Sequence, residues 1–181
     1  MKNFLRDGYV ILRNSINRKD FKFIQNIAFE ALNIKKKTYK NLLKSVQKSK
    51  KSSFDYTLPI HKKFVTNDVF SKVLLQKKIF SFLSNQLGRD LSHHDDPSVT
   101  LNMSSKNDSE KNYHFKNWHQ ELWSGASTST LALWTPIIHH SSKLGQVEFV
   151  KGSHLWGHVP HKNRKLIVIP KKYNMKKINL E

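Results

Sequence analysis

The chain has no cysteine, no long apolar run and few acidic residues, and each shortage removes or narrows a class of function. Without cysteine in 181 residues it can form no disulfide, no cysteine-ligated zinc site and no thiolate nucleophile. No stretch approaches a membrane span. The start, "MKNFLRDGYVILRN", has charges on both sides of its short apolar run, unlike a signal peptide. We therefore expect a cytoplasmic protein.

Acidic residues number 13 against 32 lysines and arginines, which gives a formal net charge of +19. This balance raises the question of nucleic acid as a partner. Only five of the 32 basic residues are arginine, however. The arginine fork suits bases and phosphates, whereas lysine acts as a solvated point charge. Two interpretations stay open: a generally basic surface, or a dedicated module that binds polyanions.

Length and composition favour one domain. A chain of 181 residues with 38% apolar and 11% aromatic residues can bury a substantial core. The sequence shows no internal repeat and no Gly/Ser linker, so we expect a single domain over residues 1–181. Within it, residues 35–53 form a basic insert, with eight lysines and no acid from Lys35 to Lys51. The insert is either a helix on a phosphate-rich surface or a solvated helix or loop.

The first half of the chain is mainly helical in pattern. A β-branched and aromatic run after an Asp-Gly turn predicts one strand over Tyr9–Leu12. Apolar residues at helical spacing then predict a helix with Asn17 as its N-cap. A second helix is predicted to begin after Asn67 or Asp68 and to stop at Gly88.

The second half is rich in short runs typical of strands. These runs are bounded by Gly, Pro, Ser and Asn, and they read "PSVTLNMSS", "STLALWTPI", "GQVEFVKG" and "KLIVIP". Helices followed by strands indicate an α+β domain whose strands form a sandwich or jelly roll.

One stretch of the second half, "NWHQELWSG", sets an imidazole and a carboxylate two residues apart. Alternate residues of a strand project from the same face, so His119 and Glu121 would point into one space about 6–7 Å apart. An imidazole nitrogen and a carboxylate oxygen are two of the three donors in the facial triad that holds Fe(II). The pair alone is a weak signal, because any exposed strand can show it by chance.

Four segments in order strengthen this interpretation. They are "FLRDGYVILRNSI" (4–16), "WHQE" (118–121), "WT" (134–135) and "GQVEFVKGSHLWG" (145–157). Together they resemble the phytanoyl-CoA dioxygenase family of Fe(II)/2-oxoglutarate-dependent oxygenases. The likeness covers residues 4–16 and 98 to about 165, and the basic middle of the chain contributes little to it.

The resemblance implies a double-stranded β-helix, a cupin-like jelly roll with N-terminal helices packed outside it. It implies an oxidoreductase that uses Fe(II) and the co-substrate 2-oxoglutarate to hydroxylate a small-molecule substrate. His119 and Glu121 would be catalytic iron ligands, and Trp134 would line the co-substrate pocket. Gln120 would support the strand from its opposite face.

The family's second iron-binding histidine and its 2-oxoglutarate-binding arginine are not found among the 62 residues that follow His119 (181 − 119). The closing strands that carry them are therefore expected to be missing. Three interpretations follow. The chain is a shortened reading frame that needs a C-terminal segment or a second chain. Another histidine (His154, His158 or His161) is the third ligand. Or the chain is an inactive jelly-roll remnant that only binds.

Two further histidine clusters, "SHHDDPS" (92–98) and "IHHSS" (138–142), raise the question of zinc. Adjacent histidines on a strand face opposite ways and cannot share an ion without a bend. We therefore interpret both clusters as solvated. Ser153 beside His154 resembles a nucleophile and its base, but a pair without a third group and an oxyanion hole is no catalytic triad.

Overall fold

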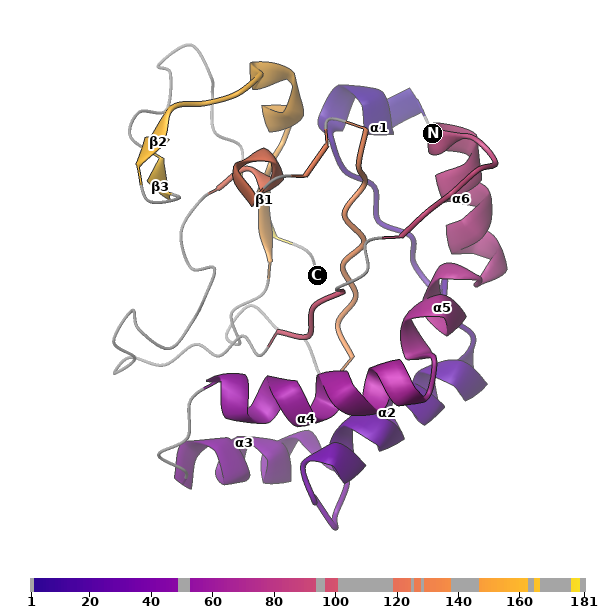
Figure 1. Ribbon diagram of the computed structural model, residues 1–181, viewed down its shortest axis with the longest axis vertical. Coiled ribbons are helices and arrows are strands. Elements are labelled where there is room, and N and C mark those ends of the chain that lie inside the picture. The colour runs from indigo at the N-terminus through magenta and orange to yellow at the C-terminus, as the bar shows by residue number, and fades with distance from the viewer. Residues whose placement is uncertain are drawn as a thin grey trace. The chain divides into compact units, whose positions relative to one another are not determined.

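The protein is described here by a computed structural model, whose helices and strands are drawn in Figure 1. Its chain divides into two compact units. One unit comprises Leu12–Leu101 and Leu133–His139, and we call it the helical unit. The other comprises Met1–Ile11, Asn102–Ala132 and His140–Glu181, and we call it the strand unit. The residues that the structure describes are 2–48, 53–93, 97–100, 119–124, 126–127, 129–137, 147–162, 165–166 and 177–179.

The first helix of the helical unit, α2 (Arg18–Ala31), begins where the sequence predicts. The Asn17 side chain accepts a hydrogen bond from the Asp20 amide at 2.9 Å, which satisfies one of the free N–H groups of the first turn. Ile24, Ile27 and Ala28 follow at spacings of three and one and are all buried. This apolar side of α2 is one wall of the core.

Two helices pack beside α2. Helix α3 (Tyr39–Lys48) falls within the predicted basic insert, and α4 (Ser53–Thr66) packs against α2. Leu42 of α3 is buried with Phe29 and Ile34, and the Tyr56 hydroxyl of α4 donates to the Ser45 carbonyl of α3 at 3.3 Å. Within the described part of the insert, residues 39–48 are therefore a helix, and its buried side at Leu42 packs against Phe29 of α2 and against Ile34.

The predicted second helix is divided into α5 (Val69–Leu74) and α6 (Lys77–Leu87). Asp68 occupies the N-cap position of α5 in a left-handed conformation, φ 54°, without a capping hydrogen bond from its side chain. The predicted stop is confirmed, because Gly88 ends α6 with φ 95°, a value that favours glycine. No helix in the described ranges is both long and apolar enough to cross a membrane.

Replacing Asn17 with alanine should lower the free energy of unfolding by about 1–2 kcal/mol. The variant loses the cap, and it also loses the hydrogen bond that the Asn17 side-chain Nδ2 donates to Oε1 of Gln76 at 3.0 Å. Urea denaturation followed by circular dichroism measures the change. Asn85→Ala, an exposed substitution on α6, is the matched control. Equal loss in both variants would contradict a capping role.

The strands predicted in "PSVTLNMSS" and "STLALWTPI" are not formed by the described residues. Residues 97–100 and 129–137 contain no strand. Val99 and Ile137 pack instead against the helical core, and the Gln25 side chain of α2 donates to the Ile137 carbonyl at 2.9 Å. The β-branched residues of these segments are used for burial against helices, a role that periodicity alone does not distinguish from a strand.

The strand unit begins with a short helix, α1 (Lys2–Asp7), and the predicted strand over Tyr9–Leu12 is wrong because these residues form no strand. Two antiparallel pairs are described. Strand β1 (Glu148–Val150) pairs with β4 (Lys177–Asn179), and β2 (His161–Lys162) pairs with β3 (Lys165–Leu166). The strand predictions in "GQVEFVKG" and at the start of "KLIVIP" are thus confirmed for the described residues.

Helix α1 is attached to the turn that follows β1. The Gly152 amide donates to the Asp7 carbonyl at 2.8 Å, and Nε2 of His154 lies 2.8 Å from the Leu5 carbonyl. Tyr9 stacks on Phe149 with ring centroids 6.3 Å apart. These contacts join two distant segments of the chain, and both segments belong to the set that carries the family resemblance.

Candidate metal centre

His119 and Glu121 lie together, although not on the predicted strand. Glu121 opens a single 3-10 turn, η2 (Glu121–Ser124), and His119 stands just before it. Nε2 of His119 is 3.7 Å from Oε1 of Glu121. This distance joins the tips of the two side chains, whereas the spacing of about 6–7 Å expected on a strand refers to the backbone positions of the two residues.

The two side chains differ in exposure. The Glu121 side chain is 65% exposed and that of His119 is 25% exposed. The polar contact with the His119 imidazole lowers the pKa of Glu121, while partial burial acts in the opposite direction. At 3.7 Å this contact is longer than an ordinary hydrogen bond, and it is an ion pair only when His119 is protonated. The carboxylate therefore stays ionised to a lower pH than a free glutamate, and its contribution to stability is lost as the pH falls through that lowered pKa.

The donor chemistry fits two positions of an Fe(II) site. Metal–ligand bonds of roughly 2.1 Å place neighbouring donors about 3 Å apart. A small rotation of the exposed Glu121 side chain would bring the pair from 3.7 Å to that separation. An imidazole with one carboxylate also suits zinc and manganese, so the pair alone does not select iron. In the described part of the chain no group of three His, Asp or Glu residues could hold a metal ion.

Gln120 holds this segment by its side-chain amide. Its Nε2 donates to the Gly157 carbonyl at 2.8 Å, and its Oε1 accepts from the Val159 amide at 2.9 Å. The amide thus binds the backbone on both sides of residue 158, next to Val159, which is 2% exposed. The prediction places Gln120 on the opposite face of a strand, which is not formed here, but its two hydrogen bonds fix the residue between the two candidate ligands.

His154, one of the alternative third ligands, is engaged elsewhere. Because a carbonyl oxygen can only accept, Nε2 of His154 carries the proton that it shares with Leu5. Nδ1 faces Gly8 so closely that a Cβ at residue 8 would lie 2.3 Å from it. The imidazole is thus packed against the end of α1, which also removes it as the base for Ser153. His158 is exposed, and His161 lies in β2.

Trp134 belongs to the helical unit, where its side chain is partly buried, while His119 and Glu121 belong to the strand unit. His93 is exposed. Several residues with a predicted role lie outside the described residues: Trp118, Gly145, His94, Asp95, Asp96 and the cluster 138–142.

Asp7 is a buried carboxylate that the sequence does not single out. Its side chain is 9% exposed and accepts from Arg6 at 2.6 Å and from Lys151 at 3.2 Å. The hydrogen bonds from Arg6 lower the pKa of Asp7 to about 2, against a cost of burial, and Lys151 adds to the effect. Its contribution to stability is present above its ordinary pKa of 3.8 and is lost as the pH falls toward 2. The Asp-Gly pair at 7–8 predicts only a turn, because the partner Lys151 is remote in sequence.

Comparison with known proteins adds no relative. No protein-family model matches the chain, and neither a curated protein nor a solved structure matches it. The functional interpretation therefore depends on the residues of this chain and on their geometry.

Proposed function

We propose that this chain is an Fe(II)- and 2-oxoglutarate-dependent dioxygenase, or part of one, of the phytanoyl-CoA dioxygenase type. Its fold would be a double-stranded β-helix with helices outside, and its substrate a small molecule in the cytoplasm. The observation that carries the proposal is the 3.7 Å separation of His119 Nε2 and Glu121 Oε1. Contact between α1 and the turn after β1, the two outer segments of the resemblance, supports it further.

In this proposal His119 and Glu121 hold the metal by one nitrogen and one oxygen. When bound, Fe(II) would supply the activation of oxygen that oxidises 2-oxoglutarate and the substrate. Gln120 fixes the backbone between the ligands through its two hydrogen bonds, so each side chain starts from a defined position. Trp134 is proposed to line the co-substrate pocket. The third donor would come from outside the described residues or from a second chain.

A catalytically inactive binding protein is the alternative. It is favoured by one observation, namely that no three-donor group exists within the described ranges. Such a protein would fold and bind a partner without turnover. Succinate formation separates the two functions: purified protein with Fe(II), 2-oxoglutarate and oxygen should form succinate if the first is correct, and none if the second is.

Fe(II) binding measured by anaerobic calorimetry is the direct test of the metal pair. His119→Ala and Glu121→Gln should each weaken binding about a hundredfold or more, since each removes a direct ligand. The matched controls are His93→Ala and Glu148→Gln, which remove the same chemical groups from other exposed positions. Both controls should bind as the unmodified protein does. Absence of binding by the unmodified protein, or equal weakening by the controls, would remove the proposal.

A further inference from the structure

Exposed lysines lie close together in the sequence of the helical unit, away from the metal pair. In the described part of the insert all the lysines before Lys48 are exposed. We call them the α3 lysine surface: Lys35, Lys36, Lys37, Lys40 and Lys44.

The helical periodicity of α3 determines on which side of the helix its lysines lie. Leu42 is 3% exposed and packs with Phe29 and Ile34. A helix advances about 100° per residue, so Lys40 and Lys44 lie roughly 160° from Leu42 and about 40° from each other. Both therefore lie on the solvent side, about 6 Å apart along the helix axis. The burial of Leu42 thus orients two cations in the same direction.

The loop before α3 is held by its own hydrogen bonds. The Lys36 carbonyl accepts from the Thr38 amide at 2.7 Å and from the Asn41 side chain at 3.0 Å. The Thr38 carbonyl in turn accepts from the Leu42 amide at 3.1 Å. The backbone at Lys36 is thereby attached to the first turn of α3, so the exposed lysines of the loop stay close to those of the helix.

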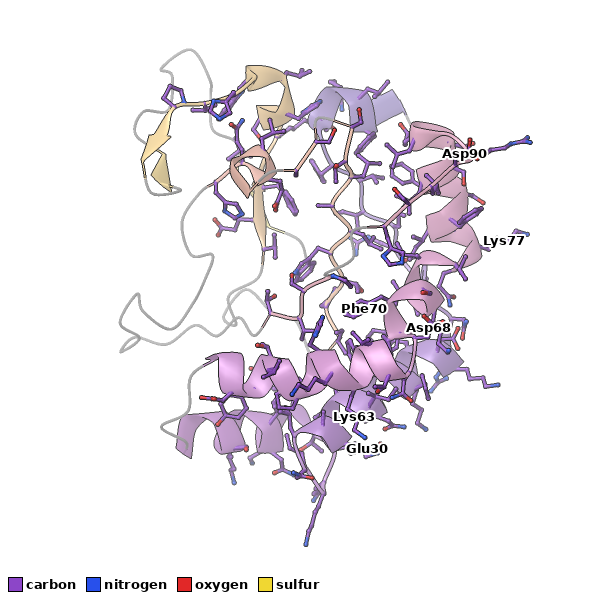
Figure 2. All side chains as sticks on the ribbon, in the orientation of Figure 1. Glu30, Lys63, Asp68, Phe70, Lys77 and Asp90 are labelled. Atoms are coloured by element: carbon purple, nitrogen blue, oxygen red, sulfur yellow. The ribbon has the colours of Figure 1, made fainter. Side chains whose placement is uncertain are left out.

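Few anions compensate this charge. Lys37 pairs with Glu30 at 2.7 Å, and that hydrogen bond together with the charges of Lys37 and Lys63 lowers the pKa of Glu30 (Figure 2). The Glu30 carboxylate thus interacts with Lys37 of the loop before α3 and with Lys63 of α4. Within the described ranges, the remaining lysines of the surface make no ion pair: Lys35, Lys36, Lys40 and Lys44. Like charges one helical turn apart repel each other, and an external polyanion would relieve that repulsion.

We infer that the α3 lysine surface binds the phosphate backbone of a nucleic-acid duplex. Lysine point charges are attracted to phosphate oxygens, and without the arginine fork we expect that contact to be independent of base sequence. A membrane fits less well, because the apolar side of α3 is already buried at Leu42 and cannot insert between lipids. Single strands also fit less well, because Tyr56 is buried and Tyr39 is partly buried, so neither offers an open face for base stacking.

The test is binding of a labelled 30-base-pair DNA duplex of arbitrary sequence to the full chain, followed by fluorescence anisotropy from low to high salt. Affinity should fall steeply with salt. The variant Lys36→Gln, Lys40→Gln, Lys44→Gln should reduce the log–log salt slope by about 3 and weaken binding at least about tenfold at moderate salt. The control Lys19→Gln, Lys72→Gln, Lys77→Gln removes the same charge from elsewhere on the helical unit. In this control variant, Lys19 and Lys72 are the lysines whose charges lower the pKa of Asp20.

The control variant should keep the salt slope of the unmodified protein to within about 1. Equal loss in both triple variants would mean that only net charge matters, which would overturn the inference. So would the absence of binding at low salt. Vesicles containing phosphatidylserine provide the last comparison: if they bind more tightly than the duplex, with the same loss in the α3 variant, the surface is a membrane site instead.

Discussion

Replacing Phe64 with alanine is expected to lower the free energy of unfolding by about 3–5 kcal/mol, because a buried ring is lost and a cavity remains. Phe64 is 1% exposed and lies in the core between α2, α4 and α5, with Ile24 and Val69 as neighbours in the same cluster. The ring of Phe70, which is labelled in Figure 2, meets it edge-on with ring centroids 5.7 Å apart, a favourable geometry for an aromatic pair.

Urea denaturation followed by circular dichroism at helical wavelengths measures this loss. Phe80→Ala is the matched control, since Phe80 is an aromatic residue of the same unit but 42% exposed. We expect the control to cost less than about 1 kcal/mol. If both variants lose the same stability, Phe64 is not the centre of the helical core and the packing of α4 against α2 is misassigned.

The elements that the sequence predicts well are those with local signals. Asn17 caps α2 through the Asp20 amide three residues later, and Gly88 ends α6 by its own backbone freedom. Both signals act within one turn of the chain. Helix α4 has no such signal, and Pro59 in its middle normally argues against a helix. Its formation depends on burying Phe64 and Ile60 against α2, which is a tertiary effect.

Strand predictions fail where a run of β-branched residues packs against helices and does not pair with a neighbouring strand. Ile137 receives its hydrogen bond from Gln25, 112 residues earlier, and no local pattern encodes that contact. The same difference between what the local sequence predicts and what it does not applies to the candidate metal pair. The residue types and spacing of His119 and Glu121 predict two side chains that meet, and their tips lie 3.7 Å apart, but the spacing does not predict the 3-10 turn that begins at Glu121.

Gly8→Ala is expected to destabilise the strand unit by about 2–5 kcal/mol through backbone strain and overlap together. Gly8 ends α1, its amide donating to the Phe4 carbonyl at 2.8 Å, and it has φ +80°. A Cβ there would lie 2.3 Å from Nδ1 of His154, so either the ring or α1 must move. The bond between His154 and Leu5 would be lost with that movement, and hydrogen exchange of the amides at residues 4–8 would report it.

The Gly152→Ala variant separates the cost of backbone strain from the cost of steric overlap with His154. Gly152 has nearly the same φ, +76°, but its Cβ would lie 3.8 Å from the nearest atom, the Arg6 carbonyl oxygen. This control should cost only the backbone strain, about 1–2 kcal/mol. Removing the ring should also restore part of the loss, so Gly8→Ala combined with His154→Ala should be less destabilised than the sum of the two single variants. Strict additivity would show that His154 does not pack on Gly8. The contact between α1 and the turn after β1, which supports the proposed family, would then need another explanation.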